Sequence, residues 1–113
     1  MKLSSKETDG ITIVALHGSL LGGPDASALN EELHKLTEKK KVRIVIDMSG
    51  VESMNSSGLT MLINALTTVK NASGTLELAG ASRKLESLIA ITKLSTVFES
   101  FPTVKKAVAS FSH

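Results

Sequence analysis

Residues 42–66 read VRIVIDMSGVESMNSSGLTMLINAL, and two different periodicities follow one another in this stretch. The segment from Val42 to Ile46 is apolar at nearly every position, which is typical of a strand buried on both faces of an α/β sheet. From about Ser56 to Lys70, apolar residues recur at the spacing of a single helix face: Leu59, Leu62, Ile63, Leu66 and Val69. A buried strand followed by an amphipathic helix is the repeating unit of an α/β fold.

The rest of the chain supplies further strands for the same sheet. The apolar runs Ile11 to Leu16 and Leu76 to Ala79 predict two more buried strands. The polar segment Lys2 to Glu7 predicts an edge strand, joined to the next by a tight hairpin turn at Asp9-Gly10. A further short strand is expected near Val97-Phe98.

Three more helical patterns alternate with these strands. The first opens at Pro24, where Asp25 or Ser27 is expected to supply the capping oxygen. Another follows a Ser82 cap, and the last starts at Pro102. Their inward residues are, in that order, Leu29, Leu33 and Leu36; Leu85, Leu88 and Ile89; and Val104, Ala107 and Val108.

Together these elements predict one α/β domain over residues 1–113, in the order β-β-α-β-α-β-α-(β)-α. Right-handed crossovers make strands joined through a helix parallel. We therefore expect a sheet of four to five strands, mostly parallel, with an antiparallel N-terminal edge hairpin and about four helices.

Composition excludes several classes of protein. The chain has no cysteine, so disulfide frameworks and thiolate metal sites are excluded. The net charge is only +2 and 3% of the residues are aromatic, so direct nucleic-acid binding is not expected. Lys39–Lys41 and Arg43 are interpreted as solvated charges at a helix end and the following strand entry. No apolar stretch approaches the roughly 20 residues of a membrane span, and the polar start predicts a cytoplasmic protein.

Catalytic and cofactor motifs are incomplete. The loop GSLLGG, residues 18–23, follows a strand and precedes a helix, but it lacks a P-loop lysine and the dinucleotide-binding spacing. Ser56 and Ser57 lie outside any G-x-S-x-G sequence. The three histidines are dispersed along the chain: His17, His34 and His113. We therefore expect no catalytic activity, no metal site and no cofactor.

The helix that begins near residue 56 has a neutral surface. No charged residue occurs from Ser53 to Val69, although half of such a helix faces water or a partner. The face opposite the apolar stripe is small, neutral and Met-bearing, which suits docking against another protein; a neutral face without a partner is the alternative. The predicted partner-binding residues are Asn55, Ser56, Ser57, Gly58, Thr60, Met61, Asn64 and Thr68.

Ser57 falls in the first turn of this helix, with Asn55 or Ser56 as the expected N-cap. A phosphate added there would meet unpaired backbone N–H groups and the positive end of the helix dipole. It would also place about −1.5 to −2 charges on an otherwise neutral docking face. A phosphate at Ser57 would therefore act as a switch through local electrostatics and would not need to unfold the protein.

At these residues the sequence resembles the STAS domain of bacterial anti-sigma factor antagonists. Residues 42–66 carry the resemblance: a buried strand ending in Asp47, a short loop, then a serine pair and a glycine that open a helix. The early strand with its GSLLGGPD loop, the LELAG segment and the helix from Ser82 to Ile91 agree in order. The resemblance covers nearly the whole chain.

The resemblance implies a STAS-like fold and a switch between partners. Members of the family bind an anti-sigma factor that is also a serine kinase, which frees a sigma factor and thereby regulates transcription. The kinase phosphorylates the second serine of the pair, here Ser57, and a PP2C-type serine phosphatase restores the binding form. The family's preceding aspartate position holds Asn55, a departure that bears on kinase recognition and on the phosphatase rate.

Domains of this type also bind partners without being phosphorylated, in stressosome-like assemblies and in lipid-transport complexes at membranes. An unswitched STAS binding subunit of such a complex is the alternative function. The retained Ser57 favours the phosphorylation-switched antagonist.

Overall fold

The computed structural model describes residues 1–91 and 99–111. The strand predicted near Val97-Phe98 lies outside these residues. The order of the elements agrees with the order predicted from the sequence. They are β1 (Lys2–Thr8), β2 (Ile11–Leu20), α1 (Pro24–Glu38), β3 (Arg43–Met54), α2 (Ser56–Asn71), β4 (Thr75–Ala79), α3 (Arg83–Ile91), β5 (Glu99–Phe101) and α4 (Val104–Ser110).

The five strands form one sheet whose spatial order follows the chain, β1-β2-β3-β4-β5. β1 is antiparallel to β2, and the other neighbours pair in parallel. The β1–β2 hairpin turns at Asp9 and Gly10, which have positive φ angles of 53° and 79°. Two such residues give a turn whose twist matches that of the flanking strands. The predicted mixed sheet with an antiparallel edge is confirmed.

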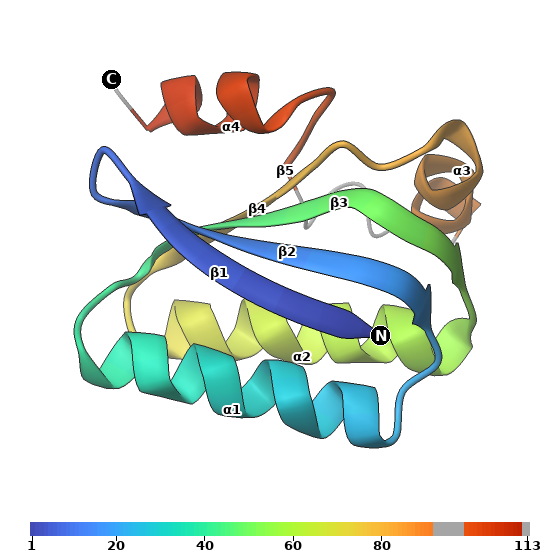
Figure 1. The fold of residues 1–113 in the computed structure, drawn as a ribbon, viewed down its shortest axis with the longest axis horizontal. Coiled ribbons are helices and arrows are strands. Elements are labelled where there is room, and N and C mark those ends of the chain that lie inside the picture. The colour runs from blue at the N-terminus through green and yellow to red at the C-terminus, as the bar shows by residue number, and fades with distance from the viewer. Residues whose placement is uncertain (92–98, 112–113) are drawn as a thin grey trace.

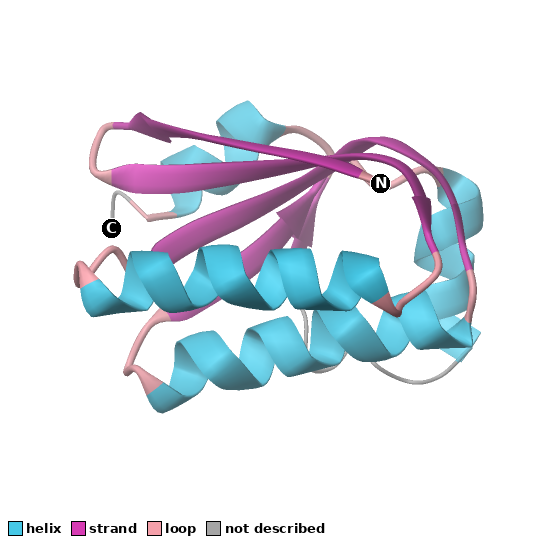
Figure 2. Ribbon diagram, turned by 60° about the horizontal axis from the view of Figure 1, so that its bottom comes forward, coloured by secondary structure: helices cyan, strands magenta, loops and turns pink. Residues whose placement is uncertain are grey.

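The helices divide unequally between the two faces of the sheet. Helices α1 and α2 lie side by side over one face, and α4 covers the other (Figure 1, Figure 2). Within the described residues, the α1–α2 face holds a cluster of 21 buried residues, of which α3 contributes Leu85 and Ile89. The predicted inward residues Ile63 and Leu88 are only partly buried at its edge. The α4 face holds five buried residues: Ile11, Ile13, Val45, Ala79 and Ala107.

Strand β3 is longer than expected. It does not end at Asp47 but continues to Met54, where it pairs with Leu20 at the end of β2. The register with β2 shifts twice on the way, so the buried residues Met48, Val51 and Met54 recur every three positions. Irregularities of this kind insert an extra residue into one strand. The segment therefore lacks the period of two by which a strand is recognised in sequence.

The capping of α1 and the start of α4 differ from prediction. α1 begins at Pro24 as predicted, but its N-cap is Gly23, with no side-chain capping hydrogen bond. The Asp25 carboxylate instead lies 3.5 Å from the nitrogen of Met1. α4 begins at Val104 rather than at Pro102, because the Thr103 hydroxyl oxygen accepts a hydrogen bond from the Lys106 N–H at 3.2 Å and so caps the helix.

The start of α3 agrees with prediction. The Ser82 hydroxyl oxygen accepts a hydrogen bond from the Leu85 N–H at 3.3 Å, as expected of an N-cap.

Candidate functional site

The first turn of α2 carries the serine pair. Asn55 is the N-cap: its backbone is extended, and its side-chain oxygen accepts a hydrogen bond from the Gly58 N–H at 2.8 Å. The choice between Asn55 and Ser56 as the cap is thereby decided for Asn55. Ser56 and Ser57 are then the first two helical residues, and both are exposed. An amide oxygen caps a helix about as well as a carboxylate does, so the capping geometry does not need an aspartate here.

Gly58 fixes where α2 starts. A Cβ at this position would collide with the backbone carbonyl of Leu20 and lie 2.9 Å from the Leu20 Cβ. The Asn55 N–H also donates to the Leu20 carbonyl, at 3.2 Å. Gly58, one of the predicted partner contacts, is therefore buried in the free chain, where it lets the first turn of α2 pack directly on the end of β2.

The loop between β2 and α1 lies against Ser57, a contact that sequence reasoning missed. Gly22 has a φ of 82°, and a Cβ there would lie 2.7 Å from the Ser57 Cβ. Beside it lies Leu21, which is 55% exposed. In the described part of the chain, Leu21 is the one large hydrophobic side chain that is exposed. The paired glycines in GSLLGG signal a left-handed turn, but nothing in the sequence says that this turn meets the helix of Ser57.

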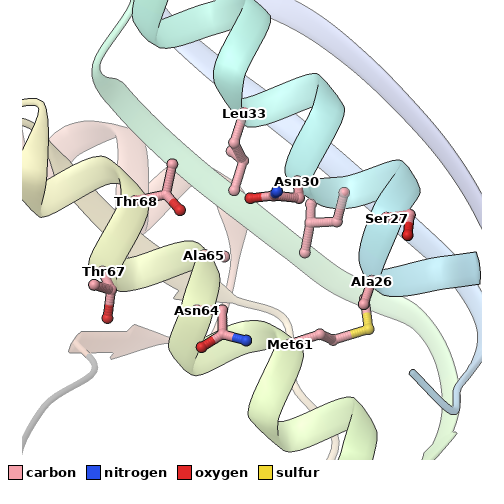
Figure 3. Close-up of a pocket in the computed structure, with 10 residues that line it drawn as sticks. Ala26, Ser27, Asn30, Leu33, Met61, Asn64, Ala65, Thr67 and Thr68 are labelled. Carbon is pink, nitrogen blue, oxygen red and sulfur yellow. The ribbon is translucent and has the colours of Figure 1, made fainter. Parts of the chain in front are cut away.

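A groove of about 410 Å³ separates α1 from α2. The described residues that line it carry no charge: Ala26, Ser27, Leu29, Asn30, Leu33, Met61, Asn64, Ala65, Thr67 and Thr68. Figure 3 shows the Met61 thioether extending towards Ala26 on α1. Met61 is only 3% exposed, so its placement on the outer face of α2 is wrong. The reason is that α2 has two buried sides, one against the sheet and one against α1.

The outer side of α2 remains a neutral surface. The exposed residues Ser56, Ser57, Thr60, Asn64 and Thr67 form it, and we call this set the neutral strip. The hydroxyl of Thr60 donates to the Ser56 carbonyl at 3.0 Å, and the hydroxyl of Thr67 donates to the Ile63 carbonyl at 3.1 Å. The single hydrogens of these two hydroxyls are used within the helix, so Thr60 and Thr67 offer a partner their acceptor oxygens and methyl groups, beside the Asn64 amide and the two serines. The last predicted contact, Thr68, is half-buried beside the groove.

Other candidate chemistry does not gather at this site. His17 and His34 are exposed on β2 and α1, and His113 lies outside the described residues. The Asp47 carboxylate accepts hydrogen bonds from the N–H and the hydroxyl of Ser49, at 3.0 and 2.7 Å. Within residues 1–91 and 99–111 no three His, Asp or Glu side chains cluster as a metal ion would need. Over the same ranges no helix is long and apolar enough to cross a membrane.

A family model for the STAS domain matches residues 2–107. The chain therefore belongs to the STAS domain family, as the strand, loop and serine pair of residues 42–66 suggested.

Individual relatives match the chain over nearly their full length. BtrV of Bordetella bronchiseptica, provisionally named an anti-sigma factor antagonist, is 24% identical over 111 residues, which are 98% of this chain and 95% of BtrV. A Thermotoga maritima protein with the same provisional name superposes with a TM-score of 0.88 at 20% identity, covering 98% and 95% of the two chains. The phosphorylated form of the Bacillus cell-fate determinant SpoIIAA gives 0.74 at 14% identity, covering 97% and 99%.

Proposed function

We propose that this chain is an anti-sigma factor antagonist that is switched by phosphorylation of Ser57. It binds an anti-sigma factor with serine-kinase activity through the neutral strip and the neighbouring β2–α1 loop. Phosphorylation by that kinase releases the complex, and a PP2C-type phosphatase restores binding. The observation that carries this proposal is an exposed serine in the first turn of α2, at the edge of an uncharged surface.

The surroundings of Ser57 suit a phosphate. The first turn of α2 has no acidic residue, and the amides that open a helix lack intrahelical acceptors and favour an anion. The Asn55 side chain accepts from the N–H of Gly58, and its backbone carbonyl accepts from the N–H of Leu59, so neither uses the N–H groups of Ser56 and Ser57. A phosphate on Ser57 therefore gains favourable contacts within the free chain, and the fold persists in both states of the switch.

The same phosphate opposes a partner. Its charge of about −1.5 to −2 would have to lose water in a complex whose contact surface is neutral on this side. Removing the hydration of an unpaired charge costs several kcal/mol, against a total of about −8 to −12 kcal/mol for a micromolar to nanomolar complex. Desolvation alone is thus large enough to release the partner, and no change of fold is required.

Ser57 is favoured over Ser56 by its neighbours. Both side chains are exposed because Asn55 takes the capping role, so a cap hydrogen bond does not protect Ser56 from a kinase. Ser57 lies against Gly22, where α2 meets the β2–α1 loop, whereas the carbonyl of Ser56 accepts the hydroxyl of Thr60 along the outer side of α2. A phosphate on Ser57 would therefore lie where α2 and the β2–α1 loop meet. Ser57 is also the position that the family resemblance indicates.

The proposal is tested by phosphorylation in vitro. The wild-type chain, Ser57→Ala and the matched control Ser56→Ala are incubated with ATP and purified anti-sigma factor kinases from the source organism, and the products are mapped by peptide mass spectrometry. We expect one phosphate on Ser57 in the wild type and in Ser56→Ala, and none in Ser57→Ala. If the kinases bind the chain but leave Ser57 unmodified, the unswitched binding subunit becomes the better description.

A further inference from the structure

The outer edge of β1 is a surface that the proposed function does not use. β1 forms one end of the sheet (Figure 1), and of its seven residues all except Leu3 are exposed. It pairs with β2 residue by residue without a register shift, and it contains no proline. Edge strands are commonly shortened, or interrupted by a bulge or a proline, so that no other strand can pair with them. β1 has none of these interruptions.

The hairpin turn determines which backbone groups of β1 face outward. The turn at Asp9-Gly10 has two residues, so Thr8 and Ile11 flank it and form a hydrogen-bonded pair. Hydrogen-bonded and non-bonded pairs then alternate along an antiparallel ladder. The backbone hydrogen bonds made outside helices and strands by the described residues include none to β1. Every second residue of β1 therefore has its N–H and C=O groups pointing outward and unused: Leu3, Ser5 and Glu7.

Two polar contacts and one apolar contact hold β1 in place on the α1 side. The Ser5 hydroxyl donates to the Glu32 carboxylate of α1 at 2.9 Å, and the Lys41 ammonium lies 3.2 Å from the Glu7 carboxylate. The Leu3 side chain packs on the edge of the large buried cluster. The edge is therefore ordered before any partner arrives, which lowers the entropy cost of binding.

The charges of β1 divide between the two faces of the sheet. Side chains alternate along a strand, so Lys2 and Lys6 lie on the opposite face from Glu7. Across the ladder, Lys2 pairs with His17 and Lys6 with Ile13, so no carboxylate on β2 lies opposite either lysine. The ion pairs among the described residues do not include these two lysines. One face of the β1 edge therefore carries two exposed positive charges without an acidic partner.

We propose that the β1 edge binds an extended, acidic segment of another protein, which adds to the sheet as a strand beside β1. Backbone hydrogen bonds to the outward groups hold such a strand, and side chains at alternate positions give specificity. Carboxylates four positions apart on the incoming strand match the spacing of Lys2 and Lys6 on one face. This site goes beyond the proposed function and does not depend on it, because it uses no residue of α2.

The two lysines disfavour a second copy of the chain as the occupant. If two copies of β1 pair with their helices on the same sides of a shared sheet, the lysines of both strands lie on one face, where like charges repel. A nucleic acid or a membrane offers phosphates but no peptide backbone, so the outward N–H and C=O groups would stay unused. An acidic strand uses both the backbone edge and the charges.

The test uses a synthetic peptide of the length of β1, in which glutamates four positions apart are separated by valine and threonine. Its binding to the full chain is followed by NMR, together with amide hydrogen exchange along β1. We expect saturable binding that slows exchange by about tenfold or more at the outward amides of Leu3, Ser5 and Glu7. The amides between them should change little, because they already bond to β2.

Charge reversal tests the role of the lysines. Lys2→Glu combined with Lys6→Glu should weaken binding of the acidic peptide by about tenfold or more, because two attractive cross-strand pairs become repulsive. The matched control reverses two exposed lysines on α2 and α3, Lys70→Glu with Lys84→Glu, and should bind like the wild type at the same net charge. An equal loss of affinity in the control would mean nonspecific attraction and would overturn the site.

A backbone variant tests strand addition itself. Ser5→Pro removes an outward N–H and should weaken binding by about tenfold or more. Ser5→Ala loses the same contact with Glu32 but keeps the N–H, so it should bind like the wild type. The exchange measurement on the wild type needs no variant, so the proposal stays testable even if Ser5→Pro folds poorly.

Four outcomes contradict the proposal. A peptide with lysines in place of the glutamates that binds equally well would remove the charge selectivity. Binding of the acidic peptide without slower exchange at the outward amides would place it elsewhere on the chain. Binding to phosphatidylglycerol vesicles but not to the peptide would make the lysines a membrane contact. Self-association through β1 without peptide binding would make a second copy the occupant.

Discussion

The two faces of the sheet differ in how much they bury. Among the described residues, a cluster of 21 buried residues lies under α1 and α2, helices of 15 and 16 residues. In the same part of the chain, the α4 face holds five buried residues and one buried carboxyl, and its helix has seven residues. On the first face, the close approach of Gly58 to Leu20 sets where α2 starts. The second face holds its helix on far fewer side chains.

The difference teaches that a local change has a different reach on each face. A phosphate on Ser57 would be added to a surface that is fixed by packing beneath it, so we expect it to act on a partner through electrostatics and hydration. A change beneath α4 meets a thinly held helix, so we expect it to act on the position of that helix. The predictions below test this contrast, from the largest expected effect to the smallest.

The largest effect is expected from cavities made on the two faces. Leu62→Ala removes a fully buried side chain of α2 and should lower the free energy of unfolding by about 2–5 kcal/mol. Val108→Ala on α4 removes a partly buried one and should cost about 1 kcal/mol or less. Urea denaturation of both variants measures the difference. Equal losses would show that α4 is held as firmly as α2.

The next effect separates the two sides of α2. Met61→Lys places a charge between α1 and α2, where Met61 is 3% exposed. It should lower the free energy of unfolding by about 2–4 kcal/mol. The loss stays within this range because a lysine can extend its ammonium group towards the mouth of the groove. Asn64→Lys, one turn further on and exposed, should change it by no more than about 0.5 kcal/mol. Thermal melts decide this, and a harmless Met61→Lys would place Met61 on the outer face after all.

A smaller effect is expected at the two capped helix starts. Asn55→Ala removes the acceptor of the Gly58 N–H and should cost about 1 kcal/mol of global stability. Asn55→Asp, the control, keeps an acceptor and should leave stability within about 0.5 kcal/mol. Thr103→Ala removes the cap of α4 and should speed hydrogen exchange mainly within α4. A cooperative, global loss in Thr103→Ala would contradict the independence of that helix.

Much of the fold was predictable because its elements show their natural periods. Buried parallel strands appear as continuous apolar runs, and α1 shows its inward face at Leu29, Leu33 and Leu36. The second half of β3 was missed because its register shifts replace the period of two by a spacing of three. The capping of α1 was missed because Gly23 caps it without a side chain, which leaves no residue-type signal.

The candidate site was predictable only where it depends on local sequence. Neighbouring residues limited the N-cap to Asn55 or Ser56 and placed Ser57 in the first turn of the helix, and the structure has Asn55 as the cap and Ser57 exposed. The burial of Met61 and Gly58 was missed because it depends on which elements cover α2, and a single helix pattern does not report a second buried side. Gly22 was missed for the same reason: its contact with Ser57 is made by chain folding across distant parts of the sequence.

The smallest effect on the free chain, and the largest on its proposed partner, is expected from Ser57→Asp. A carboxylate in the first turn of α2 meets the positive end of the helix dipole, so the free energy of unfolding should be unchanged or raised by about 0.3–1 kcal/mol. Binding to the anti-sigma factor should nevertheless weaken strongly, since that charge must be desolvated in the complex. Ser57→Ala, which adds no charge, should bind like the wild type. Calorimetric titration paired with thermal melts separates the two effects. Loss of binding together with loss of stability would mean that the substitution damages the fold. Binding by Ser57→Asp at wild-type strength would mean that this end of α2 is not where the partner docks.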